Sequence, residues 1–277
     1  MIQYDSHIHT AFSTDSDTPM EDMIRQGIIN NLSGITFTDH MDYGFPDTYE
    51  WNCPDGYSPF TFNLEQYIHY IQQFKDVYRD QIQIFCGVEI GLKEDVYEEN
   101  VSLSQHPSLD YRIGSIHLVD NMDPYYPEYW ECNDEKRSLE KYFETTLINI
   151  EKLGDIQIDT FGHLDYIVRY APSGYKLYSY RAFSDLIDEI LRQLIHREIS
   201  LEVNTSGYKN GGTMPNPSED ILRRYKDLGG ERISFGSDAH TPDRLSKHFT
   251  DAEKLVRELG YRRYVTFVEG NEVWHEF

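Results

Sequence analysis

The chain has 277 residues, 39% of them hydrophobic, and a formal net charge of −23 at pH 7. This length can bury a full core and suits one α/β barrel, so we expect a single domain over residues 1–277. The acidity argues against nucleic acids and anionic membranes as partners, because a negative surface repels their phosphates.

The sequence carries no sign of export. It has no apolar run near the roughly eighteen residues of a membrane span, and its first residues, MIQYDSHIHT, lack the regions of a secretory signal. We therefore expect a cytoplasmic protein. Cys53, Cys86 and Cys132 form neither an even set nor a CxxC pair, so we expect reduced structural thiols rather than disulfides or a thiolate metal site.

Short β-prone apolar runs alternate with longer stretches of helical periodicity. We expect strands over residues 3–7, 34–39, 82–89, 111–117, 159–163, 200–204 and 233–237. Thr18-Pro19 resembles a helix cap followed by proline at the first helical position. Apolar stripes at helical spacing then occur at residues 20–28, 64–71, 139–150, 183–194, 221–225 and 252–259. This alternation predicts helices packed on a parallel barrel that is closed or nearly so.

Two connections are longer than usual for α/β units, residues 41–62 after the second strand and residues 118–137 after the fourth. Both follow the carboxyl ends of predicted strands. Because the active sites of such barrels lie at that end, these loops are candidates to cover a substrate pocket.

Histidines and carboxylates gather at the same strand ends. His7 and His9 are two residues apart, so they point to the same side of an extended chain. One such pair is weak, because a buried histidine is usually a hydrogen-bonded core residue, but six of the seven predicted strands end in a side chain that can bind a metal. The candidates are His7, His9, His40, Glu89, His117, His163, Asp238 and His240.

Imidazoles and carboxylates without thiolates suit zinc, manganese or iron better than calcium or copper(I). A single zinc ion needs only three or four ligands, so these candidates indicate more than one ion. Glu89 is able to bridge two of them.

Six motifs resemble those of the polymerase and histidinol phosphatase (PHP) family of metal-dependent phosphoesterases, in the family's order. They are His7-Ile8-His9, Thr38-Asp39-His40, Gly87-Val88-Glu89, Ser115-Ile116-His117, Gly162-His163 and Ser237-Asp238-Ala239-His240. The resemblance implies a distorted (β/α)7 TIM-like barrel with three divalent ions, Zn, Mn or Fe. Within the family, the sequence most resembles the stand-alone enzymes that act on L-histidinol phosphate in histidine biosynthesis.

The resemblance also implies how the ligands divide. The first ion takes His7, His9, Glu89 and Asp238, the second takes Glu89, His117 and His163, and the third takes His40 and His240. Many relatives add a histidine to the third site from the turn after the first strand. Here that turn offers Asp15, which is either a ligand or an ordinary turn acid.

A phosphomonoester dianion needs charge neutralised on its oxygens and a nucleophile at neutral pH. Two ions about 3.5–4 Å apart meet both needs, since water bound to zinc has a pKa near 7. We expect a hydroxide bridging the first two ions to attack phosphorus directly, with Asp238, Glu89 and His240 as catalytic residues. Asp238 would orient or deprotonate the water. No P-loop, GxSxG elbow or cysteine nucleophile offers another route.

Substrate contacts are expected on the same face. Arg169 follows the fifth strand, and Asn204 and Lys209 follow the sixth, where they are candidates to bind phosphate, although loop-stabilising roles fit them as well. Asp42, Asp47 or the loop tyrosines are candidates for the imidazole and ammonium groups of the substrate.

Other functions stay open at this point. A related phosphoesterase would act on another small phosphate ester or a nucleotide. An amidohydrolase-type barrel shares the HxH opening but usually has a metal-bridging lysine where this chain has Glu89. A metal-storage protein is the non-enzymatic alternative. The sequence does not indicate the oligomeric state.

Overall fold

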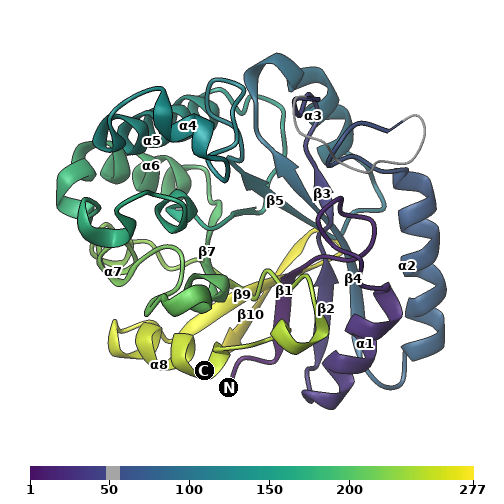
Figure 1. The fold of residues 1–277 in the computed structure, drawn as a ribbon. Helices are drawn as coiled ribbons and strands as arrows, with labels where there is room; N and C mark the ends of the chain where they lie inside the picture. The colour runs from purple at the N-terminus through teal and green to yellow at the C-terminus, as the bar shows by residue number, and fades with distance from the viewer. Residues whose placement is uncertain (48–56) are drawn as a thin grey trace.

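A computed structural model describes residues 1–47 and 57–277, with only the backbone at residues 175, 210 and 211. Parallel strands form its centre (Figure 1). Their order is β1 (Tyr4–Ile8), β2 (Gly34–Phe37), β4 (Gln83–Gly91), β5 (Tyr111–Ser115), β6 (Thr160–Phe161), β7 (Ser200–Asn204) and β8 (Ile233–Gly236). This path confirms the seven predicted strands and their parallel arrangement.

The first and last strands of this path come together beside the HxH motif. Ile8 forms a parallel bridge with Ala239. The backbone N of His9 donates to the carbonyl of Ala239 at 2.9 Å, and the N of Asp238 donates to the carbonyl of His7 at 2.8 Å. The sheet is therefore nearly closed into a barrel, and the closure itself holds three candidate ligands.

Several strands end earlier than predicted. At these points, hydrogen bonds to side chains near the site replace the backbone hydrogen bonds of the sheet. The strand predicted over residues 34–39 ends at Phe37, and β3 (His40–Met41) resumes the pairing with β4. Between them, the Asp39 carboxylate accepts hydrogen bonds from the backbone N of Thr10 and Ser13 at 2.6 and 3.1 Å. This contact ties the second strand to the turn after β1.

Helices surround the barrel (Figure 1). Those predicted from apolar stripes are α1 (Met20–Ile29), α2 (Leu64–Tyr78), α5 (Glu135–Glu151), α6 (Ser184–His196), α7 (Glu219–Asp227) and α8 (Phe249–Glu258). Thr18 does not cap the first of them. Pro19 takes the cap position, and the Thr18 hydroxyl donates instead to the carbonyl of His240 at 2.7 Å. Among the described residues, no helix is both long and apolar enough to cross a bilayer.

Two helices and a β-hairpin were not predicted. Helix α3 (Tyr97–Ser104) lacks an apolar stripe and is anchored by buried Asn100, which donates to the carbonyl of Gly91 at 3.1 Å. Helix α4 (Pro127–Glu131) lies within the long connection after β5. The strands β9 (Arg263–Val268) and β10 (Asn271–Glu276) form an antiparallel hairpin.

The hairpin lies at the end of the barrel opposite to the site. Val265 and Phe267 of β9 are buried against Tyr111 and Ile113 of β5, and Tyr111 is the first residue of that strand. The carboxyl ends of the strands are therefore free to carry the functional residues. Of the three cysteines, Cys86 is a buried free thiol, Cys132 is an exposed one, and Cys53 lies outside the described residues.

Candidate metal centre

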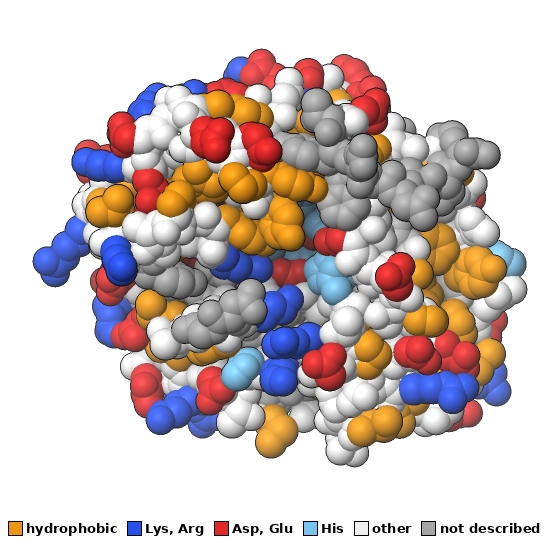
Figure 2. Space-filling model, viewed as in Figure 1, with side chains coloured by type: hydrophobic (Ala, Val, Ile, Leu, Met, Phe, Trp, Pro, Cys, Tyr) orange, Lys and Arg blue, Asp and Glu red, His pale blue; other side chains and the backbone are white. Residues whose placement is uncertain are grey.

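A cavity of about 930 Å³ opens at the carboxyl ends of the strands, and seven of the nine candidate ligands line it, whereas His7 and His9 are fully buried. Figure 2 shows histidine and acidic side chains in this hollow, with hydrophobic side chains along one side and Lys and Arg side chains along another.

The innermost group joins β1 to β4. The Nε2 atoms of His7 and His9 lie 3.0 Å apart, and Glu89 Oε2 is 3.1 Å from the first and 3.4 Å from the second. All three side chains are buried. Asp238 Oδ1 lies 3.5 Å from His9 Nε2, so the four residues expected at the first ion are neighbours.

A second group forms around the other oxygen of the same carboxylate. Glu89 Oε1 lies 2.8 Å from His163 Nε2 and 3.2 Å from His117 Nε2. The Ser115 hydroxyl also donates to this oxygen at 2.6 Å. Glu89 thus faces two groups of imidazoles with its two oxygens, which is the geometry of a bridging carboxylate.

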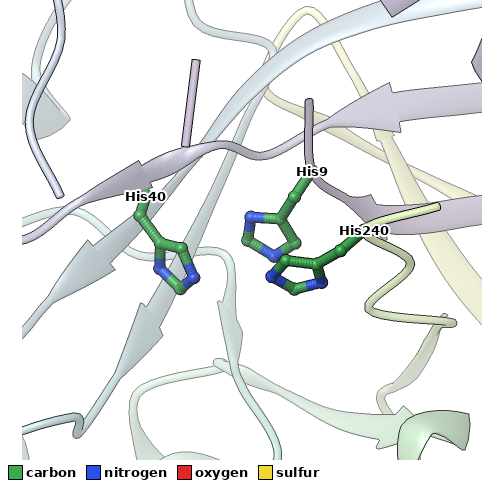
Figure 3. Close-up of side chains that lie close together, drawn as sticks. All are labelled: His9, His40 and His240. Atoms are coloured by element: carbon green, nitrogen blue, oxygen red, sulfur yellow. The ribbon is translucent and has the colours of Figure 1, made fainter. Parts of the chain in front are cut away.

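The third group is the most exposed. His240 Nε2 lies 3.0 Å from Asp15 Oδ2, and His40 Nε2 lies 3.7 Å from the same oxygen. Figure 3 shows that the rings of His9, His40 and His240 converge on one space. Potential ligand atoms of these three histidines lie within 4.8 Å of one another.

The structure brings together all the residues that the sequence proposed as ligands, but the groups overlap. His40 belongs with His9 and His240, and also with Glu89 and His117. His40 Nδ1 lies 3.2 Å from Glu89 Oε2. The assignment of individual ligands to ions therefore remains a proposal.

Hydrogen bonds on the outer side of the cluster orient its imidazoles. Nδ1 of His7 donates to Glu202 Oε1 at 2.6 Å, and Nδ1 of His117 donates to Asp42 Oδ2 at 2.7 Å. We infer that each Nδ1 carries the proton because its partner is a carboxylate, so the Nε2 lone pair faces the cluster. Metal-binding histidines are held in this way.

The chemistry of the cluster fits divalent cations. No Lys or Arg side chain in the described part of the chain pairs with Glu89, whose ion-pair partners are all imidazoles. The buried Nδ1 of His40 has no hydrogen-bond partner among those residues. Burial works against ionisation of Glu89, but when no metal is bound the protonated imidazoles of His7, His40 and His117 hold its pKa well below the ordinary value. Such a set of inward-facing acceptors is stabilised by bound cations.

Asp238 links the cluster to basic residues. Its Oδ2 accepts from the Ser206 hydroxyl at 2.9 Å and lies 3.8 Å from an Arg169 nitrogen, while Lys209 Nζ donates to its carbonyl at 3.0 Å. Its φ is +53°, a strained value for a residue with a Cβ. Although burial raises the pKa of Asp238, Lys209 and His7 bring it well below the ordinary value.

The three predicted substrate contacts have different positions. Arg169, at the end of the 3₁₀ helix η2 (Tyr166–Arg169), and Lys209, in η5 (Thr205–Gly211), both line the cavity. Asn204 is fully buried and donates to Glu202 Oε2 at 3.0 Å. The Asn204 side chain therefore holds the Glu202 carboxylate in place rather than facing the cavity.

Sequence reasoning missed Glu202. Its Oε2 also accepts from the backbone N of His163 at 2.8 Å, so β6 ends at Phe161 where this bond replaces the ladder. A single acid between Leu201 and Val203 in a buried strand was the available signal. Asp42, a candidate for the substrate, is buried and bonded to His117, whereas Asp47 is exposed.

The fold and this cluster define a metal-binding α/β barrel, and a family model agrees. The model of the PHP domain matches residues 5–206, well over half of the sequence. The chain belongs to the PHP domain family.

Relatives within that family share one name. The chain is 34% identical, over 94% of its length and 94% of the relative's, to a probable histidinol-phosphatase of Clostridium acetobutylicum. It is 28% identical to a histidinol-phosphatase of Lactococcus lactis, over 96% and 95% of the two chains.

A solved structure from Lactococcus lactis resembles the whole fold. It is a histidinol phosphate phosphatase complexed with zinc, L-histidinol and phosphate. The match has a TM-score of 0.87 and 28% identity, and it covers 98% of each chain. That relative therefore binds a metal ion, an amino alcohol and phosphate.

Proposed function

We propose that this protein is a metal-dependent phosphomonoesterase that hydrolyses L-histidinol phosphate to L-histidinol and phosphate. The observation that carries the proposal is the buried Glu89 carboxylate between two groups of imidazoles, on the floor of a cavity with Arg169 and Lys209 on its wall. The relatives named histidinol-phosphatase, which align along nearly the whole chain, support the substrate.

We further propose three divalent ions, of which zinc is supported by the Lactococcus relative. The ligands would be His7, His9, Asp15, His40, Glu89, His117, His163, Asp238 and His240. The ions would supply Lewis acidity, which neutralises charge on the phosphoryl oxygens and makes water a competent nucleophile at neutral pH.

The side chains of the protein would do the rest. The Arg169 guanidinium and the Lys209 ammonium would bind phosphoryl oxygens and hold the ester in the cavity. Oδ1 of Asp238 would accept the proton of the attacking water, because Oδ2 already accepts a hydrogen bond from Ser206. Glu202 and Asp42 would keep His7 and His117 in the required tautomer.

Phosphate release tests this proposal. Protein of measured metal content is assayed on a panel that contains L-histidinol phosphate, other small phosphate esters and nucleotides. We expect L-histidinol phosphate to have the highest kcat/KM. Comparable low turnover on every ester would contradict the substrate, a preference for a nucleotide would favour the related phosphoesterase, and inactivity of fully metallated protein would favour metal storage.

Two variants test the residues. His117→Ala and Asp238→Ala are expected to lose metal and activity together, since each removes a side chain next to Glu89 or His9. Full activity in either variant would refute the proposed ligand set.

A further inference from the structure

A tight turn in the connection after β5 fixes one acidic residue at the cavity. Val119 and Met122 exchange two backbone hydrogen bonds, at 2.9 and 3.0 Å. Asp120 and Asn121 between them have φ values of +52° and +60°. Positive φ at both central residues is the mark of a type I′ turn, whose backbone leaves little freedom. Asp123 directly follows Met122, the last residue of this turn, so its backbone has a defined position.

The carboxylate of Asp123 lines the cavity without a cation beside it. Its Oδ1 accepts from the backbone N of Tyr125 at 2.8 Å. Among the described residues, no Lys, Arg or His forms an ion pair with it, although Asp120 three residues earlier is paired with Lys141 at 2.6 Å. Burial raises the pKa of Asp123 to about 6. A partly buried carboxylate without a cationic partner is stabilised by any cation that enters the cavity.

Aromatic rings continue from Asp123 toward the metal centre. The ring centroid of Tyr170 lies 5.4 Å from that of Tyr125 and 5.7 Å from that of Tyr166, in edge-to-face contacts. The Tyr166 ring in turn lies 5.9 Å from the His117 ring. These tyrosines form a wall that contacts the metal centre at one end. Ring faces of this kind attract ammonium and imidazolium groups.

The cavity is therefore divided by charge. Arg169 and Lys209 lie beside Asp238, where an anion is stabilised, and the Arg169 guanidinium lies 6.0 Å from the Tyr166 ring centroid, so Tyr166 marks the boundary between the two ends. Asp123 and the exposed ring of Tyr125 lie on the loop that follows β5. Figure 2 shows hydrophobic side chains along one side of this hollow and Lys and Arg side chains along another. A ligand that fills it would carry a phosphate at one end and a cation at the other.

We propose that Asp123, together with Tyr125, Tyr166 and Tyr170, forms a cation subsite that selects phosphate monoesters of amino-bearing alcohols. This inference rests on the proposed function and deepens it, because it names the residues that recognise the part of the substrate away from phosphorus. Asp123 would bind the ammonium or imidazolium group, and the tyrosine rings would pack against it.

The test uses Asp123→Asn in the metallated full chain, with Asp120→Asn as the matched control. Asparagine keeps the size of the aspartate side chain, and Asp120 is an exposed carboxylate in the turn that precedes Asp123. Each protein is assayed on L-histidinol phosphate and on phenyl phosphate, an aromatic ester without a cation. Binding of L-histidinol is measured separately by calorimetry.

We expect Asp123→Asn to raise KM for L-histidinol phosphate roughly ten- to a hundredfold, the size typical of a charged hydrogen bond. Its kcat/KM for phenyl phosphate should stay within about twofold of wild type, its binding of L-histidinol should weaken in parallel with the KM change, and Asp120→Asn should behave as wild type. Equal losses on both esters, or unchanged KM and L-histidinol binding, would overturn the subsite. Failure of wild type to release phosphate from any ester would count against the proposed function alone, because the calorimetric titration still tests Asp123.

Discussion

The Glu202 carboxylate accepts a hydrogen bond from Nδ1 of His7 at 2.6 Å, and both side chains are almost completely buried. Glu202 is not a candidate ligand, yet it decides which His7 nitrogen faces the cluster. Its other oxygen binds the backbone of His163, so one carboxylate positions two proposed ligands. The metal centre therefore depends on an outer layer of acids.

Replacing this acid should weaken metal binding without removing a ligand. We expect Glu202→Gln to lower metal affinity and kcat/KM about ten- to a hundredfold, the usual effect of losing such a partner. Competition with a chelator measures the affinity, and excess metal should restore much of the activity. The control is Glu198→Gln, an exposed acid paired with Arg232. Equal metal affinities in the two variants would contradict the positioning role.

Asp15 is the departure from the family pattern, and its geometry makes a specific prediction. Its Oδ2 lies between His240 and His40, and its side chain is 30% exposed. We expect Asp15→Ala to lower the metal content by about one ion per chain, and Asp15→His to retain it, because imidazole is an equally good ligand. Elemental analysis after dialysis measures the content. Asp17→Ala, an exposed acid of the same turn, is the control. Full metal content in Asp15→Ala would show that Asp15 is an ordinary turn acid.

The position of the metal centre could be predicted because parallel strands have their carboxyl ends at one edge. Once His7, Glu89 and His163 were placed at strand ends, their convergence followed from the topology alone. The order of the motifs, which resembles that of the PHP family, then indicated how the ligands would divide among the ions. Asp15 was harder to place, because a turn has no periodicity that fixes where its side chains point.

The supporting residues could not be predicted in the same way. A buried acid such as Glu202 or Asp42 reveals that it needs a partner, but nothing in its own strand says which histidine lies across the barrel. Asp123 depends on the I′ turn before it, and the Asp120-Asn121 pair that allows this turn is also common in ordinary loops. Sequence patterns report local structure, whereas these contacts join distant segments.

Removing the ions should lower stability as well as activity. The cluster buries the carboxylates of Glu89 and Asp238, and bound cations would compensate the cost of burying these charges. A ligand at about 100 times its Kd stabilises the folded state by about 2.7 kcal/mol. We expect chelation to abolish phosphate release and lower Tm by several degrees, and added zinc or manganese to reverse both. An unchanged Tm together with full activity after verified metal removal would contradict a metal centre.

The hairpin at the other end of the barrel should contribute to stability without contributing to catalysis. The Phe267 side chain of β9 is 6% exposed, and its ring stacks on Tyr111 with centroids 5.2 Å apart. We expect Phe267→Ala to lower the free energy of unfolding by about 3–5 kcal/mol, because it leaves a cavity in a packed cluster. Urea unfolding of the metallated protein measures this loss.

Because Tyr111 begins β5 and the site lies beyond the other end of that strand, kcat per folded molecule should stay within about twofold in Phe267→Ala. Val273→Ala in β10 is the matched control: its side chain is 37% exposed, so its cost should be below about 0.5 kcal/mol. A tenfold loss of kcat in Phe267→Ala at full metal content would mean that the hairpin shapes the metal centre. Equal stability of the two variants would mean instead that packing in the Phe267 cluster contributes little to stability.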